Sequence, residues 1–107
     1  LPVVETLELR EAILKRHGVD AAALIVNAMP TRMDTAGIDA AAEVLGDSPW
    51  LWAARTWQDR HARADVWLQR ARAGLPAPTW VLPLLHRRDL PLEAVDALAS
   101  ALDEEGA

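Results

Sequence analysis

Cysteine is absent from the 107-residue sequence, which excludes disulfide bonds, thiolate metal sites and cysteine nucleophiles. Lysine is nearly absent as well: ten of the eleven basic residues are arginines, and 16 acidic residues bring the net charge to -5 at pH 7. Such a charge provides no basic surface for nucleic acid or anionic lipid. No apolar run approaches the ~20 residues that a membrane-spanning helix needs. We therefore expect a cytoplasmic protein that neither binds nucleic acid nor spans a membrane.

The histidines do not indicate a metal site either. His17, His61 and His86 are scattered, and none has a paired histidine at the spacing of metal ligands. We expect no structural zinc, and we expect His61 to be a packed, hydrogen-bonded side chain. With 51% hydrophobic and 25% charged residues, the chain has the composition and length of one small globular domain.

Two short apolar segments, each ending at a polar residue or a proline, predict β-strands at about 22–28 and 79–82. Each follows a helical stretch and leads toward another, which is the rhythm of parallel strands joined by crossover helices. We therefore predict an α/β fold with two neighbouring parallel strands and a right-handed crossover. Because two strands do not close a sheet and the chain begins at Leu1 rather than Met, we expect a segment of a larger domain.

Four helices are predicted from apolar periodicity and from the residues at their ends. They cover about 2–17, 35–45, 49–73 and a last stretch from Pro91, which gives the order α-β-α-α-β-α. Asp34 and Ser48, the latter followed by Pro49, are expected N-caps. Gly18 and Gly46 are expected helix stops. The expected inward faces are Val4, Leu7 and Leu14 in the first helix, and Leu92, Val95, Leu98 and Leu102 in the last.

The long helix carries a stripe of side chains at helical spacing, formed by Trp50, Ala54, Trp57, His61, Ala64, Leu68 and Ala71. Packing within the domain is what such a stripe usually indicates. A surface that docks a partner protein is the alternative, because tryptophan is enriched at interfaces.

Motifs for catalysis are missing. The sequence has neither the phosphate loop of P-loop proteins nor the dinucleotide fingerprint, and Ser48 and Ser100 lie in no nucleophile elbow. The chain alone therefore lacks the parts for phosphoryl transfer. Asn27 is a candidate ligand-binding residue, because open α/β sheets bind ligands beyond the carboxyl ends of their strands. A turn-forming asparagine is the alternative.

Three segments, in order and in register, carry a more specific resemblance. Residues 1–9 (LPVVETLEL) are similar to a helix start, residues 23–27 (ALIVN) to a "hydrophobic-V-N" strand, and residues 81–85 (VLPLL), followed by Asp89, to a terminal strand-loop-helix. Together they resemble the arsenical-pump-driving (anion-transporting) ATPases and the related ATPases that target tail-anchored membrane proteins. These families belong to the deviant-Walker group of P-loop proteins.

The resemblance implies a role for four residues. Asn27 matches the family asparagine whose amide faces adenine, and such an amide can donate to N7 and accept from the N6 amine at once. Pro83, Leu84 and Leu85 match the loop that walls the adenine on its other side. The implied cofactor is ATP, with magnesium in the intact protein, and we expect none of it to be tightly bound to this chain alone.

The resemblance also implies a partial P-loop NTPase-type fold, in which residues 1–107 are the C-terminal part of a single α/β ATPase domain and 34–74 form a helical excursion between the strands. The phosphate-handling residues would lie upstream, so whether the chain is an enzyme is left open. The implied partners are the N-terminal portion of the same protein and, as an alternative, a second copy in a homodimer. A bacterial relative of unknown cargo fits best, because the zinc-binding C-x-x-C motif of the targeting members is missing.

The leading hypothesis is therefore the adenine-side segment of an ATPase. The alternative is a non-catalytic helical module that docks a protein partner through the Trp-bearing helix, residues 49–73. On the first hypothesis we expect no ATP hydrolysis by this chain, feeble adenine affinity, and an unpaired strand edge beside an apolar patch.

Overall fold

The protein is described by a computed structural model that covers residues 2–86 and 88–103. These residues form an α/β fold of four helices and two strands, in the predicted order. The elements are α1 (Val3–His17), β1 (Leu24–Met29), α2 (Thr35–Leu45), α3 (Pro49–Gly74), β2 (Thr79–Pro83) and α4 (Leu92–Asp103). The predicted bounds differ from these by no more than two residues at any end.

Glycines end the first two helices, as predicted. Gly18 has a φ of 65°, in the left-handed region that glycine adopts without a steric penalty, and its N–H donates to the Leu14 carbonyl at 2.9 Å. Gly46 follows α2 with a φ of 60°. Asp34 and Ser48 occupy the predicted N-cap positions, but neither side chain makes a capping hydrogen bond. The fixed φ of Pro49 is what begins α3.

The two strands are parallel neighbours, which confirms the predicted pairing. Leu24 lies opposite Thr79 and Val26 opposite Val81. Beyond Val26 the register shifts, so that Met29 lies opposite Pro83 and β1 contains one residue more than β2 over this stretch. The extra residue is accommodated at Ala28, whose φ of 55° is in the left-handed region.

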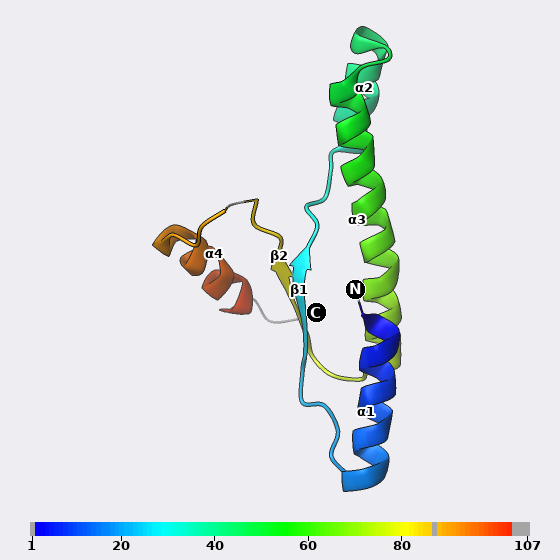
Figure 1. Cartoon of the computed structure of the whole chain (residues 1–107), viewed down its shortest axis with the longest axis vertical. Helices are drawn as coiled ribbons and strands as arrows, with labels where there is room; N and C mark the ends of the chain where they lie inside the picture. The colour runs from blue at the N-terminus through cyan, green and yellow to red at the C-terminus, as the bar shows by residue number, and fades with distance from the viewer. Residues whose placement is uncertain (1, 87, 104–107) are drawn as a thin grey trace.

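The molecule is elongated, with extents of 58 × 31 × 23 Å (Figure 1). Its radius of gyration is 17.4 Å, whereas a compact chain of this length has about 13 Å. The helix α3 lies along the long axis, the first turns of α1 lie beside its end and the rest of α1 continues the axis, and α4 is on the far side of the sheet (Figure 1). Residues 35–58, which comprise α2 and the first part of α3, stand clear of the sheet, and we call them the arm.

The core is small and lies where α3 crosses the sheet. Val26 and Met29 of β1 pack against Ala64 and Leu68 of α3, and Leu24 and Val81 border them. The predicted stripe on α3 is therefore buried only in its C-terminal half. Trp50 is 82% exposed, which corrects the expectation that it packs inside the domain, because the arm extends beyond the sheet.

Two other predicted faces need correction. In α1, Val3 is buried while Val4 and Leu14 are exposed, because only the first turns of the helix reach α3. In α4 the buried residue is Ala94, and the larger side chains Leu92, Val95 and Leu102 are exposed, with only Leu98 partly covered. The side of α4 that packs on β2 carries Ala94, so the predicted leucine face lies one step round the helix from this contact.

Candidate functional site

The carboxyl ends of β1 and β2 meet at the same end of the sheet. The N–H of Leu84 donates to the Met29 carbonyl at 2.8 Å, which places the residues after β2 beside the last residue of β1. Asn27 lies two residues before the end of β1 and is exposed. Pro83 is the last residue of β2, and Leu84 and Leu85 follow it half-buried.

The backbone of Asn27 lies on the outer edge of β1, the edge that faces away from β2. The N–H of Leu24 donates to the Pro78 carbonyl at 2.9 Å, so the backbone groups of Leu24 and Val26 point toward β2. Because alternate residues of a parallel strand point to opposite sides, the N–H and C=O groups of Ile25 and Asn27 point away from β2. Within the described residues β1 pairs with β2 alone, so this outer edge is unpaired.

A groove of about 230 Å³ runs along that edge. It is lined by side chains of α1, β1 and α3, among them Val3, Leu7, Asn27 and Leu68. None of the groove's lining residues is charged, and Asn27 and Thr6 are its polar members. Pro83, Leu84 and Leu85 are not part of its lining. The groove is mostly apolar, and none of its lining residues is a cation that would hold a phosphate.

Ala28 gives this site a strained backbone. A non-glycine residue in the left-handed region costs roughly 1–2 kcal/mol, and Ala28 is the non-glycine residue with positive φ among the described residues. Such strain is retained where the surrounding structure fixes it, often beside a binding site. It turns the chain between Asn27 and Met29, whose carbonyl accepts the N–H of Leu84.

Arg10 joins α1 to the turn that follows it, near the groove. Its guanidinium binds the Asp20 carboxylate through two contacts, Nε to Oδ1 at 2.6 Å and Nη2 to Oδ2 at 2.7 Å. Asp20 Oδ1 also accepts the N–H of Ala21 at 2.7 Å. These hydrogen bonds lower the pKa of Asp20 to about 2. Sequence reasoning missed this pair and the contribution of α1 to the groove, because residues on either side of a turn give no periodic signal.

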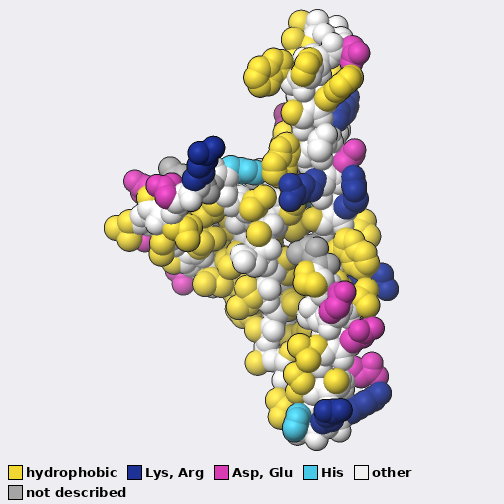
Figure 2. All heavy atoms as spheres, viewed as in Figure 1, with side chains coloured by type: hydrophobic (Ala, Val, Ile, Leu, Met, Phe, Trp, Pro, Cys, Tyr) yellow, Lys and Arg dark blue, Asp and Glu magenta, His cyan; other side chains and the backbone are white. Residues whose placement is uncertain are grey.

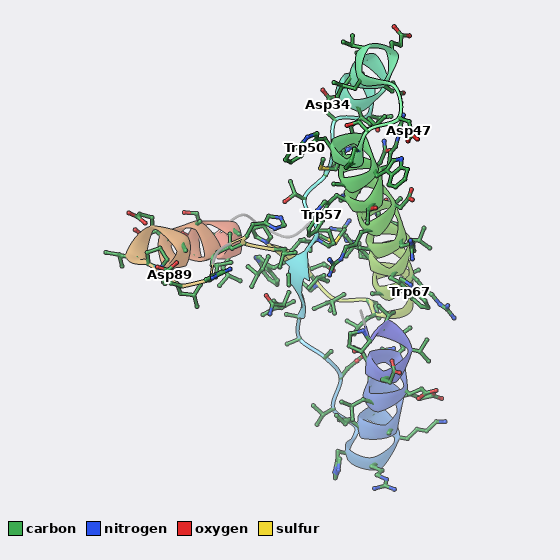
Figure 3. All side chains as sticks on the ribbon, turned by 45° about the horizontal axis from the view of Figure 1, so that its top comes forward. Asp34, Asp47, Trp50, Trp57, Trp67 and Asp89 are labelled. Carbon is green, nitrogen blue, oxygen red and sulfur yellow. The ribbon has the colours of Figure 1, made fainter. Side chains whose placement is uncertain are left out.

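A second exposed surface lies at the end of the arm. Trp50 projects from α3 near Asp34 (Figure 3), and both line a groove of about 260 Å³ between α2 and α3. Trp52 is also largely exposed. The first turns of the Trp-bearing helix therefore present exposed apolar side chains beside α2.

The histidines are not clustered. His86 packs edge-on against Trp57, with ring centroids 4.8 Å apart. His61 is half-buried and makes no hydrogen bond within the described part of the chain, which corrects the expectation that it is hydrogen-bonded. Among residues 2–86 and 88–103, no three acidic or histidine side chains come together as metal ligands. None of the helices in these ranges has both the length and the apolar character of a membrane-spanning segment.

Comparison with protein-family models, with curated proteins and with solved structures finds no match to this chain. The resemblance to the arsenical-pump-driving ATPases therefore rests on the three sequence segments alone.

Proposed function

We propose that this chain is the C-terminal, adenine-side segment of a cytoplasmic ATPase that resembles the arsenical-pump-driving, deviant-Walker P-loop family. The observation that supports the proposal most is the parallel strand pair, because ligands of open α/β sheets bind beyond the carboxyl ends of such strands. Asn27 near the end of β1 and Pro83 at the end of β2 are at that end of the sheet.

In this proposal the chain supplies contacts to the base and nothing for the phosphates. The amide of Asn27 would pair with the N7 and N6 edge of adenine, while Leu84 and Leu85 would pack against the ring. ATP and magnesium would be held in the intact protein, whose N-terminal portion would supply the phosphate loop.

The experiment is nucleotide titration of the intact protein. Asn27→Ala is expected to weaken ATP binding by about 1–3 kcal/mol, the scale of a good bidentate contact to a base. Thr31→Ala is the matched control, because Thr31 is an exposed polar residue four positions further along the same connection. An unchanged dissociation constant for the Asn27 variant would reject the assignment. A coding sequence without an upstream phosphate loop would reject the ATPase itself.

A second candidate is a non-catalytic module that docks a protein partner through helix 49–73. The specific observation in its favour is the exposure of Trp50 and Trp52 at the end of the arm. The ATPase function requires the residues at the strand ends, whereas the docking function requires only the arm.

A further inference from the structure

We propose that Trp57 of α3 positions the residues that follow β2, and that it does so through His86. This inference rests on the proposed ATPase function, in which Leu84 and Leu85 pack against the adenine ring. It names Trp57 as a positioning residue for that site, although Trp57 itself is not placed against the nucleotide. We call residues 84–86 the β2 loop.

The β2 loop has little backbone structure of its own. The N–H of Leu84 donates to the Met29 carbonyl at 2.8 Å. Within the described residues, Leu85 and His86 make no backbone hydrogen bond, and residues 84–86 belong to no helix or strand. Such a segment has low local stability unless side-chain contacts hold it. Those side-chain contacts therefore decide where Leu84 and Leu85 lie.

His86 provides a contact of this kind. Its ring meets the ring of Trp57 edge-on, with centroids 4.8 Å apart and an angle of 86° between the ring planes. This is a preferred geometry for an aromatic pair. Figure 2 shows a histidine side chain beside hydrophobic side chains in the angle between the arm and α4. The contact joins the β2 loop to α3, whose later residues Ala64 and Leu68 pack in one cluster with β1.

A second tryptophan on the same helix separates this contact from the local packing of α3. Arg60 Cζ lies 5.0 Å from the ring centroid of Trp57, and Arg70 Cζ lies 5.1 Å from that of Trp67. Both tryptophans are half-buried. Trp67 lies further toward the end of α3 that is beside α1 (Figure 3). Among the described residues, Trp57 is the tryptophan whose ring contacts a ring outside α3.

Loss of the Trp57 ring leaves the β2 loop with one contact fewer to α3. Leu84 and Leu85 then spend less time in the conformation that faces the base. A ligand that needs this conformation binds more weakly in proportion to its reduced population. Trp67 has no such link, so its loss affects α3 without changing the β2 loop.

The test is ATP titration of the intact protein. Trp57→Leu is expected to raise the dissociation constant by about two- to tenfold, the range for the loss of one aromatic pair. Trp57→Phe keeps a ring at this position and should restore most of the affinity. Trp67→Leu is the matched control, because it removes a half-buried tryptophan with the same type of arginine contact but with no partner in the β2 loop. It should leave ATP binding unchanged.

A double-mutant cycle tests whether Trp57 acts through His86. His86→Ala alone should weaken ATP binding to a similar extent, and because His86 is exposed, this variant is expected to keep the fold. The double variant should bind ATP no more weakly than Trp57→Leu alone, since the two side chains form one interaction. Additive losses, or an equal loss for Trp67→Leu, would overturn the inference.

Failure of the positioning role differs from failure of the proposed function. Unchanged ATP affinity in Trp57→Leu, together with weakened affinity in Asn27→Ala, would reject the role of Trp57 and leave the adenine site in place. No measurable ATP binding by the intact protein would reject both. Circular dichroism of each variant checks that the helices are retained.

Discussion

Asp20 is held in its ionised form by Arg10 and by the N–H of Ala21. Its pKa is about 2 in the folded protein, below its ordinary value of 3.8. A group whose pKa is lowered by folding stabilises the fold above its unfolded pKa, and this contribution is lost as the pH falls through the folded value. Here the window extends from about pH 4 down to about pH 2, as the two pKa values define.

Asp20→Asn is therefore expected to lower the thermal stability of α1 and the following turn at pH 6 to 7, and to change it little near pH 2. Thermal unfolding at a series of pH values measures this difference. Asp65→Asn is the control, because Asp65 is exposed on α3 and forms no ion pair in the described ranges. A pH-independent difference would mean that the Asp20 contact with Arg10 does not contribute through its charge.

Among single residues, the sequence indicated that Asn27 lies near a strand end, but it did not indicate the backbone conformation of Ala28. A polar residue after an apolar run indicates a strand end, and Asn27 is indeed near one. The left-handed backbone of Ala28 could not be predicted, because alanine has no preference for that region. The pairing of Arg10 with Asp20 was equally invisible, since it depends on where the turn after Gly18 directs the chain.

At the scale of elements, periodicity predicts a buried face but not the length over which a partner covers it. The α3 stripe is buried at Ala64, Leu68 and Ala71, where the sheet lies, and exposed at Trp50. The α4 face was misassigned by one step, because four leucine and valine side chains were taken to mark the contact when Ala94 makes it. Helix existence and order were predictable from caps and prolines, since those signals are local.

Leu68 is the element-scale test of the core. Leu68→Ala is expected to reduce the free energy of unfolding by about 2–5 kcal/mol, the range for a buried leucine, because Leu68 belongs to one cluster with Val26 and Met29. Val66→Ala, on the exposed side of the same helix, should change it by less than about 0.5 kcal/mol. Urea unfolding followed by circular dichroism gives both values. Similar losses for the two variants would show that the small cluster on the sheet is not the stabilising core.

For the whole molecule, the ratio of surface to core is unusual. The radius of gyration of 17.4 Å and the exposure of Ile25, which is 56% although it lies in a strand, leave much apolar area uncovered. The Ala22–Val26 run is typical of a strand that is buried on both faces. The sequence therefore predicted the strand correctly, but within the described residues Ile25 of that strand stays more than half exposed.

We expect this chain to self-associate when it is studied alone, because the open edge of β1 accepts further strands. Analytical ultracentrifugation over a dilution series measures this. Ile25→Lys should shift the population toward monomer, since lysine on an edge strand opposes pairing. Val66→Lys, at an exposed position of α3, should not shift the population. A parallel assay should detect no ATP hydrolysis. A well-folded monomer at every concentration would argue against an incomplete sheet.

The parallel pairing has a consequence for the order of folding. The strands β1 and β2 are separated in the sequence by the whole of α2 and α3, so their pairing closes a long loop. Closing that loop costs chain entropy before any contact between the strands is gained. The contacts within the arm span far fewer residues, as in the hydrogen bond between Thr35 and Gln58 at 2.9 Å. We therefore expect the helices of the arm to form before the two strands pair, because their contacts close much shorter loops.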